Sequence, residues 1–259
     1  MTKIKLSPDA EENISTALSN PAPAPTALDV QGDQYPDDPS RDVVIPVIGL
    51  INKVGGLSEK FENKAGQYAL GDSCLGKEVL VIPVSAVKLW QEVCRDGLKL
   101  EYGKEPQPLF FPSESAAKKK GYINDFSSTA PNRIEPIAKI GFLVIAPKDD
   151  TSGDYVVKVG DLQTQPARST FRRAGFRNVY QPIYNHSHRQ CLAKQINITG
   201  MSNSWVFSAG VPWSHIWTLS STVDKNDKNS WFVPTISKGP ALPVEAVKWI
   251  SDNYVGISQ

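Results

Sequence analysis

The chain has 259 residues, of which 40% are hydrophobic and 21% charged. This composition supports a packed core and excludes a globally disordered protein. The formal net charge of +1 points to no class of partner, but the charge is unevenly distributed. Residues 1–42 contain eight acids and three bases, a net charge of −5, whereas the rest contains 25 bases and 19 acids, a net charge of +6.

Residues 1–42 are predicted to form a disordered acidic tail, because a Pro- and Asp-rich segment without periodicity cannot bury enough apolar surface to fold. Residues 43–259 are predicted to form a single β-rich domain. The start of the chain lacks the apolar core of a signal peptide, and no apolar run reaches the length of a membrane span. Three widely spaced cysteines favour a reducing compartment. We therefore expect a cytoplasmic protein, in the host cytoplasm if a phage encodes it, with no membrane partner.

Short apolar runs predict most of the domain to be strands. The first three runs cover residues 43–50, 77–84 and 86–93. The next two, 138–146 and 154–160, flank KDDTSG, which predicts a hairpin between them. Four further strands are predicted at 192–199, 204–210, 215–221 and 230–236, with a turn at 226–229.

Three segments are predicted to be helices. Residues 113–121 begin with a serine cap and end at a glycine, and residues 166–175 have proline in the first turn and glycine at the end. Residues 242–254 place Val244, Val247, Ile250 and Tyr254 on one face. Many short strands with few helices predict a mainly β (α+β) fold with an OB-like β-barrel core.

One long window lacks acids: no Asp or Glu occurs from Leu162 to Val223. It contains cations interleaved with aromatic residues, as a polyanion-binding surface requires, since cations neutralise phosphates and rings stack on bases. The candidate nucleic-acid-binding residues in it are Arg168, Arg172, Arg173, Arg177, Tyr180, Tyr184, His188, Arg189 and Lys194. Arg172, Arg173 and Arg177 are the strongest candidates, because a helix end followed by a loop would expose them.

The same window also fits a less specific interpretation, in which its aromatics, including Trp205 and Phe207, are core residues and its arginines are merely solvated. Lys118, Lys119 and Lys120 form a second basic run that suits a helix C-terminus as well as a phosphate contact.

We expect no metal, no cofactor and no catalytic activity. His186, His188 and Cys191 form H-x-H-x-x-C, but a zinc site needs a fourth ligand, and strand alternation would place Cys191 on the opposite face. The sequence contains no P-loop and no nucleophile elbow. A nuclease-like pattern of Asp37, Glu62 and Lys64 has its first member in the predicted tail, which disfavours a metal-dependent nuclease.

The order of several segments resembles small single-stranded DNA-binding proteins from the replication and recombination modules of phages. The similar segments include VVIPVIGL, KEVLVIPV, SESAAKKKGYINDF, QPARSTFRRAG and LPVEAVKWI. The resemblance implies a non-catalytic single-stranded DNA-binding protein with an OB-like core, replication or recombination proteins as further partners, and room for a homo-oligomer. Two alternatives stay open: a phage structural or assembly protein, and a non-catalytic subunit of a larger nucleoprotein complex.

Overall fold

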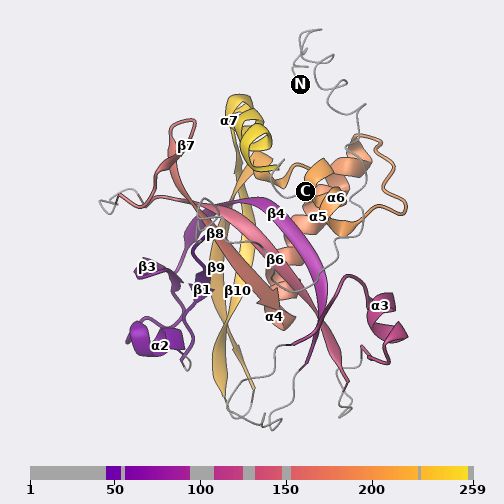
Figure 1. The fold of residues 1–259 in the computed structure, drawn as a ribbon. Coiled ribbons are helices and arrows are strands. Elements are labelled where there is room, and N and C mark those ends of the chain that lie inside the picture. Colours follow the sequence, from indigo (N-terminus) through magenta and orange to yellow (C-terminus); the bar gives the residue numbers. More distant parts are fainter. Residues whose placement is uncertain are drawn as a thin grey trace, which may run out of the picture. The chain divides into compact units, whose positions relative to one another are not determined.

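The computed structural model describes residues 45–53, 56–93, 108–124, 132–147, 153–226 and 229–255. The predicted tail, residues 1–42, lies outside these ranges. The described residues confirm a mainly β fold, built from antiparallel sheets with helices packed against them (Figure 1).

The larger sheet has seven antiparallel strands. Their order is β10 (Ser230–Ala241), β9 (His215–Lys225), β4 (Val79–Glu92), β6 (Ile134–Ile145), β8 (Leu162–Arg172) and β7 (Val157–Val159), and β5 (Phe110–Phe111) also pairs with β4. The order ends at β10 on one side and β7 on the other, so the described strands form an open sheet and not the closed barrel that the sequence predicted.

A smaller sheet of β1 (Ile48–Leu50), β2 (Tyr68–Leu70) and β3 (Ser73–Gly76) packs on the larger one, and α2 (Gly56–Lys60) lies beside β1, where the side chain of Leu57 approaches Gly49. Two hydrogen bonds hold it against β9: the hydroxyl of Tyr68 donates to the carbonyl of Ser220 at 2.7 Å, and Ser221 donates to the carbonyl of Gly66 at 2.7 Å. An isolated parallel bridge joins Val47 to Arg168 in β8. The small sheet is therefore joined to β9 and β8, two strands on different sides of β4 in the larger sheet.

Strand β4 bends at a bulge between Pro83 and Ser85, where its register with β6 shifts. Proline lacks a backbone N–H, and a bulge is one of the few places where a central strand accepts it. The extra residue also changes which alternate residues face inward. Val81 lies opposite the core residue Val144 before the bulge, and Ala86 lies opposite the core residue Ile140 after it.

The inner face of the sheet, the side of Ala86 and Ile140, is covered by helices. After β8 the chain forms α4 (Arg173–Gly175), the π-helical turn η2 (Phe176–Tyr180) and α5 (Gln181–Ala193), followed by α6 (Asn203–Ala209) and η3 (Pro212–Ser214). Phe176, Tyr180 and Ile183 insert into the same core cluster as Phe142 and Phe171. None of the described helices is long and apolar enough to cross a membrane.

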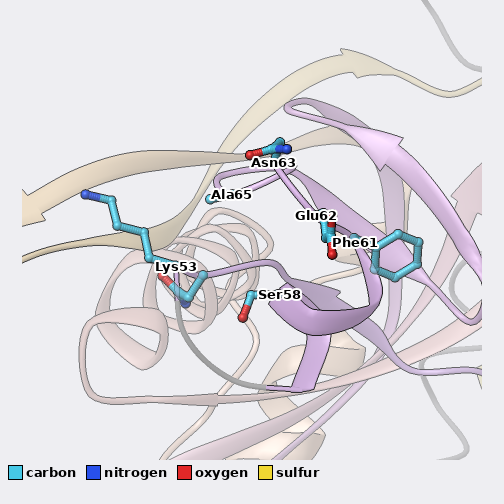
Figure 2. Close-up of a pocket in the computed structure, with 7 residues that line it drawn as sticks. Lys53, Ser58, Phe61, Glu62, Asn63 and Ala65 are labelled. Carbon is cyan, nitrogen blue, oxygen red and sulfur yellow. The ribbon is translucent and has the colours of Figure 1, made fainter.

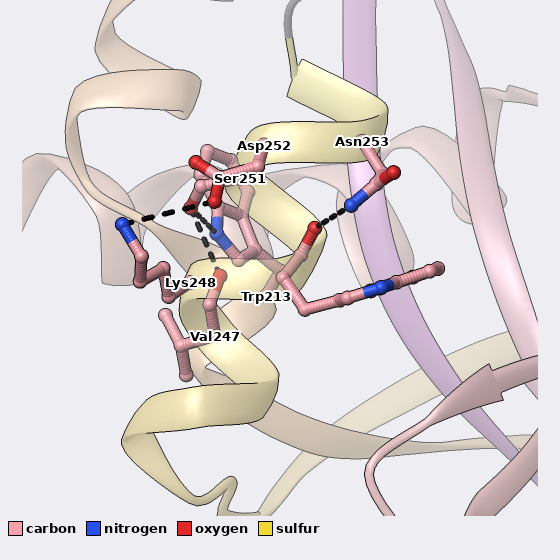
Figure 3. A network of polar contacts seen from close by, with 7 residues as sticks. Trp213, Val247, Lys248, Ser251, Asp252 and Asn253 are labelled. Carbon is pink, nitrogen blue, oxygen red and sulfur yellow. Dashed lines mark hydrogen bonds and ion pairs between the residues drawn. The ribbon is translucent and has the colours of Figure 1, made fainter.

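The C-terminal helix α7 (Val244–Ile250) and the turn η4 (Ser251–Val255) are attached to the core by a tryptophan. The buried indole of Trp213 donates to Ser251 at 3.0 Å, and Ser251 donates in turn to the carbonyl of Val247 at 3.0 Å (Figure 3). Lys248 and Asp252 form an exposed ion pair at 3.8 Å on the same helix. This chain of contacts gives the indole N–H a partner and fixes the helix on the sheet.

Several sequence predictions are confirmed. The runs at 77–84 and 86–93 are one strand, β4, and those at 138–146, 215–221 and 230–236 lie in β6, β9 and β10. The helix at 113–121 is α3 (Glu114–Lys119), capped by Ser113, and the helix at 242–254 is α7 with η4. For this last helix, the prediction that Val244 belongs to the buried apolar face was wrong, since Val244 is 78% exposed.

Other predictions are wrong. Residues 166–175 are mostly strand β8, because regular pairing with β6 overrides the local proline and glycine signals. Residues 192–199 are a helix end and a loop, and 204–210 are mostly α6, whose Ser202 cap accepts a hydrogen bond from Trp205. The segment 154–160 forms β7, but its partner is β8 and not β6, so the predicted hairpin is absent.

Helices α5 and α6 approach closely at Gly210. A Cβ at this position would lie 2.2 Å from the Cα of Ser187, nearer than real atoms approach, and the backbone cannot move aside cheaply. We expect Gly210→Ala to destabilise the protein by about 1–3 kcal/mol, the usual cost of overpacking. Urea unfolding measures this change. Gly56→Ala is the matched control, because no atom lies within 4 Å of its added methyl group; equal stability of the two variants would contradict the close packing.

Candidate nucleic-acid interface

The outer face of β4, β6 and β8, opposite the helices, contains a group of cations. Along β8, Ala167 and Phe171 point into the core, so Arg168, Thr170 and Arg172 point to the other side. Lys139 in β6 is the direct cross-strand partner of Thr170. All four residues are exposed.

The register places these cations close together. Arg168 and Arg172 are the diagonal neighbours of Lys139, a relation that separates residues by about 7–8 Å. The Lys139 ammonium lies 4.8 Å from the centre of the Phe110 ring, which is 41% exposed. We name Lys139, Arg168, Arg172 and Phe110 the outer cationic face. It combines positive charges of the kind that neutralise phosphates with an exposed aromatic ring of the kind that stacks on bases.

Among the residues of the described strands, one acid lies near this face. Glu135 is two residues before Ile137 in β6 and is nearly buried, and its carboxylate pairs with the Arg173 guanidinium at 2.9 Å. Arg173 has a positive φ of 47°, a conformation that is costly for a side chain with a Cβ. The Arg173 side chain is 71% exposed, as the sequence predicted, but its charge is paired with Glu135, and its contact with nucleic acid stays a prediction.

The remaining cations of the acid-free window lie on the helical side. Arg177, Gln181, Asn185 and Arg189 are exposed at four-residue intervals along η2 and α5. They form a polar stripe about 18 Å long with an arginine at each end. Lys194, also exposed, ends the helix. The structure thus separates Arg172 from Arg177, which the sequence grouped together.

An aromatic ladder runs along another side of the same helices. The ring of Phe176 lies 5.0 Å from that of Tyr180, Tyr180 lies 5.7 Å from Tyr184, and Tyr184 lies 6.2 Å from His188. Tyr180 is only 3% exposed, and burial raises the pKa of its hydroxyl. Its prediction as a base-stacking residue is wrong, whereas Tyr184 and His188, both half-buried, stay accessible at the outer end of the ladder.

Most other aromatics of the window are core residues. Phe171, Phe207, Trp213 and Trp217 are all buried, as the less specific interpretation of the sequence expected. Trp217 uses its indole N–H on the carbonyl of Pro212 at 3.0 Å. Aromatic content therefore does not mark the binding surface in this chain.

The basic run of α3 lies at the far end of β4, where Ala117 packs with Trp90 and Phe111. Lys118 pairs with Glu114 at 2.7 Å and holds the pKa of that carboxyl below its usual value. Lys119 and Lys120 are exposed. Their location at the C-terminal end of the helix suits the helix dipole, so their contact with nucleic acid stays a prediction.

The H-x-H-x-x-C motif lies on α5 and not on a strand. His186 and His188 are about 200° apart around a helix, so they point in nearly opposite directions. Cys191 is buried, which raises the pKa of its thiol. No group of three metal-ligating side chains occurs in the described ranges.

A small hollow of about 330 Å³ lies beside α2, next to Lys53, Ser58, Phe61 and Glu62 (Figure 2). Lys53 donates to Ser230 at 2.5 Å across this region. Glu62 and the exposed Lys64 belong to the nuclease-like pattern, but Asp37 lies outside the described residues. Among the described residues, the lining of the hollow therefore includes a single carboxylate, that of Glu62.

Sequence reasoning missed Lys139 and Phe110, which lie outside the acid-free window. Their signal was weak: Lys139 is a single polar residue in the apolar run AKIGFLVIA, as expected for an exposed position of a strand. Only the register between β6 and β8 shows that it lies between two arginines.

No family model matches the chain, and no curated protein or solved structure matches it either. The resemblance to phage single-stranded DNA-binding proteins therefore stays a prediction.

We expect His186 to make the stability of the protein depend on pH. Burial lowers the pKa of His186 to about 4, and the positive charges of Lys238, His215 and Arg189 add to the effect. An unfolded chain binds the proton near the ordinary pKa of about 6.5. Stability from this group is thus fully present above about pH 6.5 and is lost as the pH falls towards 4, by at most ~1.4 kcal/mol per pH unit.

Urea unfolding between pH 7.5 and 4 tests this dependence. His186→Gln should reduce the loss of stability over that interval, whereas His188→Gln, on the accessible side of the same helix, should not. Equal pH dependence in the wild type and His186→Gln would show that His186 is not the group responsible.

Proposed function

We propose that this protein binds single-stranded DNA without catalysing a reaction on it, and that it supports replication or recombination of a phage or mobile element. The proposal rests on the outer cationic face. There Lys139 lies between its diagonal neighbours Arg168 and Arg172, beside the exposed ring of Phe110. The nearest acid on the described strands of this face, Glu135, is already paired with Arg173.

The arrangement favours a single strand over other partners. Cations spaced along a β-sheet neutralise a phosphate backbone, and an exposed ring next to them stacks on an unpaired base of any sequence. OB-fold proteins bind strands across a curved sheet in this way, and we keep an OB-like mode of binding as part of the proposal. The biological role rests on the resemblance of segment order alone.

The central test removes the charges of the face. Replacing Lys139, Arg168 and Arg172 together by Gln should weaken binding to an oligothymidylate of about 30 nucleotides, longer than the ~4–16 nucleotides of a typical OB-fold site. The slope of log affinity against log salt should flatten by about 2, since each lost phosphate contact on a single strand contributes ~0.7. Fluorescence anisotropy at several salt concentrations measures both quantities.

A matched control removes three exposed lysines outside the face, Lys77, Lys158 and Lys225. It lowers the net charge equally, so an equal loss of binding would mean that overall charge and not this face binds the strand. Failure of the folded wild type to bind the oligonucleotide would reject single-stranded DNA binding altogether. Duplex DNA and RNA competitors in the same assay identify the preferred nucleic acid.

The ring is tested separately. Phe110→Ala should cost about 1–3 kcal/mol of binding free energy if a base stacks on it. This loss should persist at high salt, where the effect of the charge variants shrinks, because stacking is not a counterion-dependent interaction. Phe110→Tyr keeps a stacking surface and should bind like the wild type; an unchanged affinity of Phe110→Ala would remove this ring from the interface.

A further inference from the structure

A second basic region lies on the inner side of the sheet, away from the outer cationic face. A groove of about 700 Å³ opens between α5 and the β9–β10 hairpin. Asn185 and Arg189 line it from the helix, and Lys238 and Trp217 line it from the two strands. Lys238 is the direct cross-strand partner of Trp217, so an exposed cation and a buried indole lie side by side in the hairpin wall of the groove.

The charges that line the groove have one sign. Arg189 and Lys238 are exposed cations, Asn185 and Gln190 add amides, and no acid is among the described residues that form its walls. The Nε of Arg189 donates to the carbonyl of Asn185 at 3.2 Å. That bond anchors the base of the guanidinium and leaves its terminal N–H groups for a ligand.

A buried histidine lies in the wall of this groove. His186 is 5% exposed, and its ring meets those of His215 and Trp217 nearly edge-on, at 5.2 and 5.5 Å. Its Nε2 has no hydrogen-bond partner among the described residues. Buried polar atoms are seldom left unsatisfied, and an unsatisfied one at a cavity is explained by a ligand or water that completes it.

We propose that this groove is a phosphate-binding site, in which Lys238 and Arg189 bind the oxyanion and a modest side-chain shift lets His186 Nε2 donate to it. The volume lies within the range of sites for small organic ligands, so the phosphate would be that of a nucleotide-sized molecule or of a strand end. The site shares no residue with the outer cationic face, and it does not require the proposed function.

The environment of the His186 imidazole supports this assignment, because it keeps the ring neutral in a way that a bound anion would partly reverse. Burial is the main cause of the lowered pKa of His186, and the same cations that would attract a phosphate, Lys238 and Arg189, lower it further together with His215. A bound anion offsets their repulsion and favours the protonated ring. The ring resonances of His186 should therefore shift on binding in NMR spectra, and those of His188 should shift less.

Calorimetric titration of the full chain with inorganic phosphate, dTMP and thymidine tests the site. Phosphate and dTMP should bind, and thymidine should bind much more weakly. Lys238→Gln and Arg189→Gln should each weaken dTMP binding by about tenfold, the effect of one lost charged hydrogen bond. Lys225→Gln, an equally exposed lysine of the same hairpin, should bind like the wild type.

Two oligothymidylates, one with a 5′-phosphate and one with a 5′-hydroxyl, distinguish the sources of the phosphate. An effect of Lys238→Gln on the phosphorylated strand alone assigns the groove to strand ends, and an effect on dTMP alone assigns it to free nucleotides. Absence of phosphate and dTMP binding, or equal binding by Lys238→Gln and the wild type, overturns the site. That result would leave single-stranded DNA binding untouched, since the variants of the outer cationic face decide it independently.

Discussion

The architecture depends on β4, a single strand that pairs with β9, β6 and the short β5. Its first residues, from Val79 to Val81, pair with β9, and from Val81 onward it pairs with β6. The bulge after Pro83 lies within the part that pairs with β6, and Gly141 makes it sterically feasible, because a Cβ there would lie 2.5 Å from the hydroxyl of Ser85. The bulge determines which side chains of the strand face the helices and which face outward.

The alternation of side chains between the two faces of the sheet explains how the acid-free window contributes to two surfaces and also to the core. Strand β8 alternates between the core residues Ala167 and Phe171 and the exposed Arg168 and Arg172. The following helices bury the first rings of the aromatic ladder and expose the arginines of the polar stripe. The absence of acids is therefore compatible with both uses: it removes repulsion at the exposed positions and avoids unpaired carboxylates at the buried ones.

Periodicity and capping predicted the parts of the fold that local sequence determines. The apolar runs of β4, β6, β9 and β10 and the Ser113 cap of α3 are examples. Predictions failed where tertiary pairing decides. Residues 166–175 contain acceptable helix signals but form a strand because β6 offers a complete ladder. Residues 204–210 alternate like a strand but form α6, which packs its Val206 and Phe207 inward.

The candidate site was predictable only in part, for the same reason. Arg168 and Arg172 were visible in sequence as cations, but their grouping with Lys139 follows from the register between β6 and β8, which no local pattern encodes. The pairing of Arg173 with Glu135, 38 residues apart, equally required the fold. The sequence shows which charged residues are present, and the register of the sheet determines which of them are neighbours.

The two basic regions should behave as separate electrostatic units. The outer cationic face and the groove lie on opposite sides of the sheet, so a layer on the order of 10 Å or more separates their charges. At physiological ionic strength, the screening length is about 8 Å. Charges of one region therefore contribute little to the potential at the other, and the excess of bases over acids in residues 43–259 acts locally at each surface. Coupling between ligands at the two regions would then need a movement of β4, the strand that pairs both with β6 of the outer cationic face and with β9 of the groove wall.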